Sequence, residues 1–594
     1  MRSTRVDGYA PIREYAAIGD GRTVALVAAD GSIDWLTLPT ISGPAVFSAL
    51  LDAERGACFE LRPDGEFEVE RAYLEETNVL RTRFRTTGGT LEVTDALTLQ
   101  DGGLLPWFEL VRRLEAPDGD VPVRWRVRPR FDFARRAPKL DSRNGVPVLV
   151  DGRTILAVRS FGAGEPVATD DEVAGRCTIR AGDSAMLCLL SVDNEPIPLP
   201  PRDEIETRID GTCEAWRRWA DGARYEGPHR TAVVRSALVL KLLIYAPSGA
   251  MAAAPTTSLP EKIGGGRNYD YRYAWVRDAS FALDALMELG YREQAHDSLS
   301  WLLDATRRSH PRLQPMYSLS GDVLPEQEEL PLAGYRGSRP VLRGNRAAHQ
   351  IQLGAYGELL ETIALYVEQG NALDRETAVR VREIVDLTCE IWRNEDSGMW
   401  ELPEERHYTV SKIACWCAIE RALQLAGGGQ VDGDRDRWRA EQEAIRTFVD
   451  ERCWSDSRCA YAFYAGTDDL DASLLRFSRS LFFERERLAS TVDAIRDELA
   501  EGPLLYRYSG MRGQEGAFLA CSFWLVGALA TLGRVDEAEA LFGELLERAN
   551  DVGLYSEEMD PESGEMLGNF PQGLTHLAVI DAAYDLEEAR NGTS

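Results

Sequence analysis

The segment Pro198-Leu199-Pro200-Pro201 divides the chain into two parts that differ in hydrophobic periodicity. On its N-terminal side, apolar and polar residues alternate in short runs, which is typical of half-buried β-strands. On its C-terminal side, apolar residues recur every three or four positions in one segment after another, which is typical of helices packed on a core. Because proline continues neither a helix nor a central strand, this segment predicts a boundary between two domains.

The N-terminal part, residues 1–200, predicts an antiparallel β-sandwich. Its clearest hairpin joins residues 23–27 to residues 32–38 through Asp30-Gly31, a dipeptide that two-residue hairpin turns prefer. Further strands are expected where β-branched and aromatic residues lie between Gly, Asp and Pro, at residues 67–71, 79–85, 90–96, 121–129 and 185–190.

The C-terminal part predicts a helical linker over residues 201–227 and a helical domain over residues 228–594. About twelve helices in antiparallel pairs would close an (α/α)6 barrel, whose loops at one end form a concave site. Pairing alone does not distinguish a barrel from a solenoid, but the sequence shows no repeat of fixed period. The clearest helical ranges are 231–245, 280–289, 292–307, 350–369, 375–392, 412–426, 438–452, 518–532, 536–548 and 575–589.

Composition narrows the classes of partner. A formal net charge of -30 disfavours nucleic acid and anionic membranes, because both bind basic surfaces. No stretch approaches the roughly 20 apolar residues of a membrane span. Residues 1–20 mix charged and apolar residues and leave no apolar core for a secretory signal, so we expect a cytoplasmic protein. A small neutral or cationic ligand is favoured, and a homo-oligomer is compatible with the sequence.

The cysteines and histidines indicate neither a cofactor nor a metal. The ten cysteines contain no C-x-x-C pair, so we expect free thiols in a reducing compartment. His349, His407 and His576 are too widely spaced to suggest a metal site, and no H-E-x-x-H motif is present.

Residues 264–278 read GGGRNYDYRYAWVRD and stand just before a predicted helix. Aromatic faces stack on the apolar faces of sugar rings, while Arg and Asp side chains hydrogen-bond sugar hydroxyls, so this density favours a sugar pocket. The candidates are Tyr273, Trp275, Arg277 and Asp278. The alternative is structural: the loop packs beneath the helices and Asp278 caps one of them. No Lys-Ser/Thr pair follows the three glycines, which argues against a phosphate-binding loop.

Residues 325–345 form a second candidate segment, which contributes Arg339 and Asn345. It is too rich in Gly and Pro for a helix and too rich in mixed charge for a core. Loops with such side chains often carry function, although a solvated charged loop explains the same composition.

Two further candidate segments carry glutamates. In Trp400-Glu401 a carboxyl stands beside a large apolar ring, an arrangement that disfavours ionisation. Trp400 is itself a candidate substrate-binding residue. Residues 555–561 place Glu557 and Glu558 in a turn-rich acidic segment. A Trp-Glu pair at a loop edge and an acidic surface turn are the structural alternatives.

With these segments in this order, the chain resembles glycoside hydrolase family 15, the family of glucoamylases, glucodextranases and some microbial trehalases. The resemblance begins at AIGDGRT (17–23) and DGSIDW (30–35), and it ends at LGNFPQ (567–572) and THLA (575–578). It departs from the bacterial members at residues 343–346 and 402–406, near where an acceptor sugar would lie.

The resemblance implies a role for each candidate. The family's sugar-binding Trp-x-Arg-Asp falls on Trp275, Arg277 and Asp278, its general acid on Glu401 after Trp400, and its general base on Glu557, with Glu558 as an adjacent competitor. It also implies the β-sandwich followed by the (α/α)6 barrel. In the inverting geometry the two carboxyls stand about 6.5–9.5 Å apart, which leaves room for a water between base and sugar.

The sequence therefore predicts an inverting exo-acting α-glucoside hydrolase that needs no cofactor and releases β-glucose from the non-reducing end of α-linked gluco-oligosaccharides. We expect a modest preference for these over trehalose, because the acceptor-side loops offer several hydrogen-bonding groups to an extended second sugar. The alternatives are an α,α-trehalase with the same acid and base, a disaccharide phosphorylase in which phosphate replaces the base, and a non-catalytic carbohydrate-binding protein.

Overall fold

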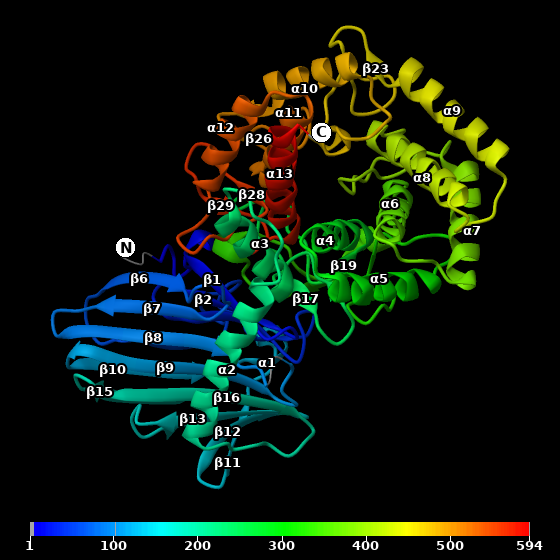
Figure 1. Cartoon of the computed structure of the whole chain (residues 1–594). Coiled ribbons are helices and arrows are strands. Elements are labelled where there is room, and N and C mark those ends of the chain that lie inside the picture. Colours follow the sequence, from blue (N-terminus) through cyan, green and yellow to red (C-terminus); the bar gives the residue numbers. More distant parts are fainter. Residues whose placement is uncertain (1–4, 101–102, 593–594) are drawn as a thin grey trace.

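The computed structural model describes residues 5–100 and 103–592. Two antiparallel sheets form the N-terminal part, and a ring of helices forms the C-terminal part, as Figure 1 shows. The predicted β-sandwich followed by an (α/α)6 barrel is confirmed. The elements change from strand to helix between residues 193 and 202, while the exact domain limits of 200 and 227 stay a prediction.

One sheet has the order β1-β2-β3-β5-β10-β15-β14, with β4 paired to β3. The predicted hairpin joins β2 to β3, and Gly31 turns it with a φ of 85°, where an added Cβ would lie 2.2 Å from the Leu61 carbonyl oxygen. The strands are β1 (Tyr15–Gly19), β2 (Val24–Ala28), β3 (Ile33–Thr37), β4 (Ala45–Phe47), β5 (Cys58–Pro63), β10 (Val121–Arg128), β14 (Val167–Ala168) and β15 (Val173–Ile179).

The other sheet has the order β11-β12-β13-β16-β9-β8-β7-β6. Its strands are β6 (Glu68–Tyr73), β7 (Leu80–Arg85), β8 (Gly89–Leu97), β9 (Phe108–Gly119), β11 (Lys139–Arg143), β12 (Val146–Asp151), β13 (Thr154–Phe161) and β16 (Ser184–Asp193). Helix α2 (Arg202–Ala220) then leads from the sheets to the helical ring (Figure 1).

The ring consists of two layers of helices. The inner layer is α4 (Val276–Glu288), α6 (Gly354–Glu368), α8 (Thr409–Gly427), η4 (Ala472–Phe477), α11 (Leu519–Thr531) and α13 (Gly573–Asn591), each in contact with the next, and α13 contacts α4. The outer layer is α3 (Arg230–Leu243), α5 (Arg292–Arg307), α7 (Arg375–Ile391), α9 (Arg435–Arg452), α10 (Arg485–Leu499) and α12 (Val535–Leu546). Outer and inner helices alternate along the chain, so the inner helices all run in the same direction.

Sequence composition explains which helices lie inside. Inner helix α11 is buried on every side and consists almost entirely of apolar residues. Outer helix α9 buries only a stripe of Trp438, Ile445 and Val449 and exposes charged residues elsewhere. Two members of the ring, α10 and η4, are absent from the predicted ranges. Helix α10 buries Leu488, Val492, Ile495 and Leu499 at helical spacing, so the sequence carries its period and the predicted ranges omit it. Element η4 is too short to show a period.

Short elements complete the described structure and mostly shape loops. They are η1 (Ile12–Glu14), α1 (Phe131–Ala134), β17 (Ile244–Tyr245), β18 (Ala250–Met251), β19 (Ala274–Trp275), β20 (Met316–Tyr317), β21 (Glu328–Leu330), η2 (Tyr335–Gly337), β22 (Val341–Arg343), η3 (Arg346–His349), β23 (Trp454–Ser455), β24 (Ala460–Tyr461), β25 (Ala500–Glu501), β26 (Leu504–Leu505), β27 (Ala517–Phe518), β28 (Glu558–Met559) and β29 (Met566–Leu567).

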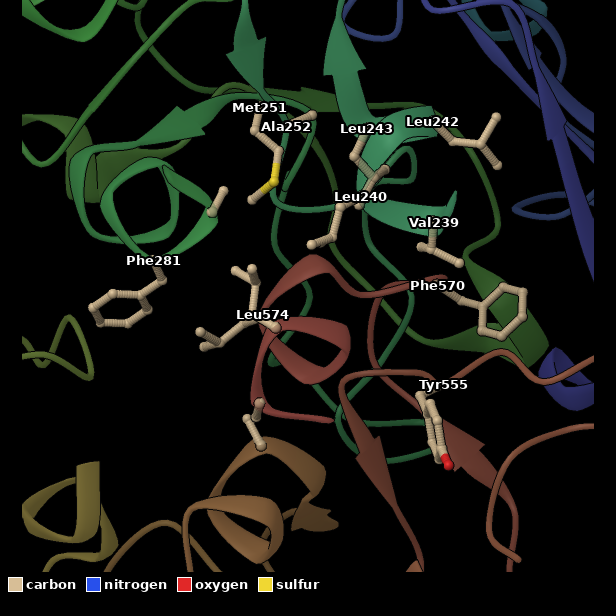
Figure 2. Close-up of a cluster of buried hydrophobic side chains, with 14 of the residues drawn as sticks. Val239, Leu240, Leu242, Leu243, Met251, Ala252, Phe281, Tyr555, Phe570 and Leu574 are labelled. Carbon is tan, nitrogen blue, oxygen red and sulfur yellow. The ribbon is translucent and has the colours of Figure 1, made fainter. Parts of the chain in front are cut away.

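Apolar packing fixes the loop that leads into α13. Figure 2 shows side chains from α3, α4 and α13 gathered around Leu574, with Tyr555 and Phe570 at the two ends of the loop. Gly573 allows this approach, because an added Cβ there would lie 3.0 Å from the Ala253 carbonyl oxygen. The loop that carries Glu557 is therefore held at both ends by the core.

Residues of both sheets brace the same region: Tyr15 and Trp35 lie in the first sheet and Arg71 lies in β6 of the other. The Asn550 side chain donates to the Tyr15 carbonyl oxygen at 2.8 Å, and the Arg71 guanidinium pairs with Asp551 at 2.7 Å. The Trp35 indole donates across the interface to the Pro255 carbonyl oxygen at 2.8 Å. These contacts attach the sandwich to the loops beside the candidate site.

All ten cysteines lie in the described ranges and are free. None of the described helices combines the length and apolar character that crossing a membrane requires.

Candidate active site

The predicted catalytic residues meet at one end of the ring. Trp275 directly precedes α4, Glu401 lies in the loop before α8, and Glu557 lies in the loop before α13. Because the inner helices run in one direction, the loops before their first turns share one end of the barrel. Residues more than 280 positions apart are thus brought to a single site.

Glu401 is held by a tryptophan. The Trp275 indole Nε1 donates to the Glu401 carboxyl at 2.5 Å, and the Gln350 amide donates to the Glu401 backbone oxygen at 3.0 Å. Glu401 has a φ of 59°, in the left-handed region that non-glycine residues seldom adopt. Such a conformation persists only where surrounding contacts impose it, and it is common at functional sites.

Arg277 and Asp278 lie beside Glu401. Arg277 Nε donates to the Asp278 carboxyl at 2.9 Å, and its Nη1 donates to the Met399 backbone oxygen at 2.9 Å, which ties the start of α4 to the Glu401 loop. Burial raises the pKa of Glu401, while the positive charge of Arg277 and the Trp275 hydrogen bond oppose this rise. Asp278 is buried in the first turn of α4 and makes no side-chain capping bond there, so the capping alternative does not describe its contacts.

Glu557 is enclosed on the opposite side of the site. Its carboxyl accepts the Asn569 backbone N–H at 3.3 Å and a hydrogen bond from the Tyr271 side chain. Gly568, with a φ of 72°, leaves room for it, because an added Cβ would lie 2.5 Å from Glu557 Oε2. Burial raises the pKa of Glu557 to about 7, and the charge of Arg507 opposes this rise most strongly. The carboxyl is thus poised between its two protonation states near neutral pH.

Glu558 engages a different set of groups. It accepts the Gly516 backbone N–H at 2.9 Å and lies 3.8 Å from Arg507. Arg507 pairs with Glu515 at 2.5 Å and with Glu261 at 2.9 Å. Burial and the neighbouring carboxylates raise the pKa of Glu558 well above its ordinary value. These four residues form what we call the Arg507 cluster: Glu261, Arg507, Glu515 and Glu558.

The three carboxyls of the Arg507 cluster have oxygens within 4.8 Å of one another, a spacing that suits a cation. The guanidinium of Arg507 supplies that positive charge itself, since it donates to both Glu515 and Glu261. One oxygen each of Glu261 and Glu558 has no hydrogen-bond partner. Arg267 also pairs with Glu515, so two arginines face three buried carboxyls, and proton uptake by one carboxyl balances the charge. Burial raises the pKa of Glu261 to about 8, which makes Glu261 able to hold that proton.

Trp400 connects the two sides of the site. Its indole donates to the Asp471 carboxyl at 2.8 Å, and the guanidinium of Arg507 lies 5.5 Å from its ring centroid. The ring also packs edge-on against Phe518. The residue before Glu401 is therefore in contact with the cluster that contains Glu558.

Three predicted substrate-binding residues make their contacts elsewhere. Tyr273 is buried in a cluster with Met316 and Ala347. The Asn345 side chain accepts the Ala347 backbone N–H and caps η3. Arg339 is exposed and donates to the Ala333 backbone oxygen within its own loop. Trp275 lies at the site, but its ring is buried and its polar edge faces Glu401, an arrangement unlike the predicted stacking on a sugar.

Several residues of the site are absent from the predicted candidates. Tyr271 lies within the quoted aromatic segment, of which Tyr273 is the predicted candidate. Asn569 lies in the quoted segment 568–572. Arg507, Glu515 and Asp471 stand in segments with no motif, and only the folded structure brings them beside Glu557 and Trp400.

A cavity of about 440 Å³ lies inside the ring. It lies further along the inner helices than the end that carries Glu401 and Glu557. Its walls come from all six inner elements, and it is bounded by acidic and aromatic side chains such as Asp284, Asp581, Trp416 and Trp524. Glu358 lines it, and the nearby charge of Arg277 lowers the pKa of Glu358 against the larger effect of burial. The cavity therefore lies behind the Arg277–Asp278 pair, and Glu401 and Glu557 are not among its walls.

Comparison with known families gives two matches that together span most of the chain. Residues 227–584 match the model of glycosyl hydrolases family 15. Residues 4–194 match the model of the trehalase-like N-terminal domain.

Curated relatives match over nearly the full length. A protein of Thermoplasma volcanium named trehalase is 33% identical over 98% of this chain and 95% of its own length. A protein of Mycolicibacterium smegmatis, also named trehalase, is 35% identical over 97% of this chain and 91% of its own length.

Among solved structures, a bacterial glucoamylase complexed with acarbose superposes with a TM-score of 0.72 and covers 99% of this chain and 96% of its own. The sequence identity is 12%, so the likeness shows the shared fold, including the barrel.

Proposed function

This chain belongs to glycosyl hydrolases family 15 and is a glycoside hydrolase, and we propose that it hydrolyses α,α-trehalose with inversion. The observation that carries the proposal is the full-length similarity to relatives named trehalase, which extends over both domains. The likeness to a glucoamylase concerns the fold alone. This order of substrates reverses the preference for gluco-oligosaccharides predicted from the acceptor-side loops.

In this proposal Glu401 is the general acid. Burial keeps its carboxyl protonated at higher pH than usual, and the Trp275 indole fixes its orientation. The proton goes to the bridging oxygen as the bond to the anomeric carbon breaks. Arg277 and Asp278, which lie beside Glu401, are the groups proposed to bind the hydroxyls of the first glucose.

Glu557 is the proposed general base. Its carboxylate takes a proton from a water molecule, whose oxygen attacks the anomeric carbon from the face opposite the departing oxygen. Tyr271 and the Asn569 N–H hold this carboxylate, whereas Glu558 is directed to the Arg507 cluster. These separate surroundings favour Glu557 over Glu558.

The test is a substrate panel of trehalose, maltose, isomaltose and maltotriose, with glucose release measured for each. We expect the highest kcat/KM for trehalose. A higher value for any of the other three contradicts the trehalase proposal and restores the gluco-oligosaccharide prediction.

Early product analysis tests inversion. An inverting enzyme releases one β-glucose and one α-glucose from each trehalose, because only the attacked carbon changes configuration. Anomeric proton NMR in the first minutes is therefore expected to show equal amounts of both. An excess of α-glucose in the first product excludes the water-activating role of Glu557.

Glu401→Gln tests the acid. This variant is expected to lose activity on trehalose by about 10²- to 10⁴-fold. It should retain most activity on α-D-glucosyl fluoride, because fluoride departs without a proton. Equal loss on the two substrates contradicts the assignment.

Location in the cytoplasm and a homo-oligomeric state stay predictions.

A further inference from the structure

One exposed aromatic side chain lies at the catalytic end of the ring. Within residues 5–100 and 103–592, the exposed large apolar side chains are Val6, Val167, Tyr269, Val323, Ile351 and Leu481, of which Tyr269 alone is aromatic. Tyr269 is 38% exposed, whereas the neighbouring Tyr273 and Trp275 are buried. A tyrosine combines an apolar ring with a polar hydroxyl, a combination that suits a surface with one apolar and one hydrated side.

Tyr269 is the outermost of three aromatic rings in contact. Its ring is parallel to that of Tyr271, with centroids 6.4 Å apart and 11° between the planes. Tyr271 in turn packs edge-on against Trp275 at 5.3 Å. Tyr271 hydrogen-bonds Glu557, and Trp275 hydrogen-bonds Glu401. The two inner rings therefore hold the two catalytic carboxyls, and the third ring extends from them toward solvent.

The backbone of Tyr269 is fixed to the base loop. Its carbonyl oxygen accepts the Asn569 side-chain amide at 3.0 Å and the Ser258 backbone N–H at 2.8 Å. The backbone N–H of the same Asn569 donates to Glu557. The backbone that carries the Tyr269 ring is thus held at a set position relative to the carboxyl that would activate water.

We propose that the exposed face of Tyr269 is the platform on which the second, departing glucose of the substrate packs. The inference rests on the proposed function and names the contact for its leaving group. The reacting glucose must lie between Glu401 and Glu557, beside Tyr271, so the second glucose lies one ring further out. Tyr269 presents its apolar face there, and the C–H face of a pyranose ring is its chemical complement.

The experiment compares Tyr269→Leu and Tyr269→Phe on two substrates. Trehalose has the departing glucose, whereas α-D-glucosyl fluoride lacks it. For Tyr269→Leu we expect kcat/KM on trehalose to fall about tenfold, mainly through KM, as loss of one aromatic contact implies. Its kcat/KM on the fluoride is expected to stay at the wild-type value. Tyr269→Phe keeps the ring and is expected to resemble wild type on both.

Three results overturn the inference: unchanged kcat/KM of Tyr269→Leu on trehalose, an equal fall on both substrates, or a fall in Tyr269→Phe as large as in the leucine variant. An equal fall would instead make Tyr269 a support for Tyr271 and Glu557. Leu481→Ala, at a 73% exposed residue bordering the inner cavity, is the matched control and is expected to leave both values unchanged. Thermal unfolding of each variant identifies any that fails to fold.

Failure of the proposed function gives a different result. If wild-type protein does not hydrolyse trehalose but hydrolyses maltose, the trehalase proposal fails by itself. The same comparison with maltose in place of trehalose then decides the role of Tyr269, because maltose also carries a departing glucose.

Discussion

Of the two glutamates proposed to be catalytic, Glu557 is buried and Glu401 is half-buried, and their surroundings distribute charge differently. Glu401 is held by a neutral indole and lies beside Arg277, which is paired with Asp278. Glu557 stands next to the Arg507 cluster, in which one buried guanidinium serves three further carboxyls. The acid therefore depends on local contacts, whereas the base depends on a cation that other groups share.

This difference has a consequence for mutation. Removing the Trp275 indole takes one hydrogen bond from Glu401 and leaves the pairing of Arg277 with Asp278 intact. Removing Arg507 changes the protonation of Glu261 and Glu558, because its charge lowers the pKa of both and neighbouring carboxyls raise it. The effect of a substitution is expected to remain local near Glu401 and to reach several carboxyls near Glu557.

The largest effect is expected from the base itself. Glu557→Gln replaces the proton acceptor with an amide, and kcat/KM on trehalose is expected to fall by about 10²- to 10⁴-fold. Glu558→Gln, the matched control one residue away, keeps its shape within the Arg507 cluster and is expected to lose much less. If Glu558→Gln is the more impaired variant, Glu558 is the base and Glu557 is not.

A large effect is also expected from Arg507→Met, which removes the ion-pair partner of Glu261 and leaves Glu515 paired with Arg267. Breaking a buried pair in this way typically destabilises by about 3–5 kcal/mol. Arg507 holds down the pKa of Glu557, so its loss raises that pKa, and the rise of kcat/KM with increasing pH is expected to begin at higher pH. Urea unfolding and a pH profile measure the two effects.

Arg507→Lys is the companion variant. It retains the positive charge but loses the two-pronged contact with Glu515, so it is expected to lie between wild type and the methionine variant. A pH profile that does not move in Arg507→Met would mean that the cluster stabilises the fold without affecting the base.

Trp275→Phe is expected to have a smaller effect, about tenfold in kcat/KM, because it removes one hydrogen bond to a carboxyl. That bond lowers the pKa of Glu401, so its loss raises the pKa. The fall of activity at high pH is therefore expected to begin at a higher pH than in the wild type. Trp438→Phe removes a similar indole–carboxylate bond, to Asp386 in the outer layer, and is the control for stability alone. A shift of the low-pH limb in Trp275→Phe would contradict the assignment of Glu401 as acid.

The smallest effect is expected from a substitution in the inner cavity, away from Glu401 and Glu557. Burial raises the pKa of Asp284 to about 8, with Glu361 and Asp581 adding to the rise and Arg476 opposing it. The folded protein therefore keeps a proton that the unfolded chain releases near pH 4, and this stabilisation is lost as pH rises through about 8.

Asp284→Asn removes that dependence and keeps the acceptor for Thr362. Between pH 5 and 8, the unfolding free energy of wild type is expected to fall more steeply than that of the variant, by at most about 1.4 kcal/mol per pH unit. Asp304→Asn, at a 76% exposed side chain on α5, is the control. Parallel curves for Asp284→Asn and wild type would show that Asp284 is ionised in the folded protein.

The predictability of the fold from sequence follows from periodicity. The Asp30-Gly31 hairpin and ten helices of the ring have local signals, and the structure contains them within a few residues of the predicted limits. Short elements show less of the hydrophobic periodicity from which a helix is predicted. The six residues of η4 are too few to display a helical period, although this element occupies one of the six inner positions.

The site is predictable to the extent that its residues stand in motifs. Trp275, Arg277, Asp278 and Glu401 were found through contiguous motifs and meet in the structure. Arg507 stands in no motif, and its relation to Glu261 arises from contacts across 246 positions. Tyr273 and Tyr269 are both tyrosines in one aromatic segment, and only the packing around them determines which is exposed.

The left-handed backbone of Glu401 bears on which residue selection favours at this position. A non-glycine residue in this conformation carries an energetic cost of about 1–2 kcal/mol that glycine avoids. Glu401→Gly would thus relieve backbone strain while abolishing the carboxyl, and selection for stability alone would favour glycine at this position. With Glu401 as the proposed acid, a glutamate at this position represents a compromise in which activity outweighs stability of the fold.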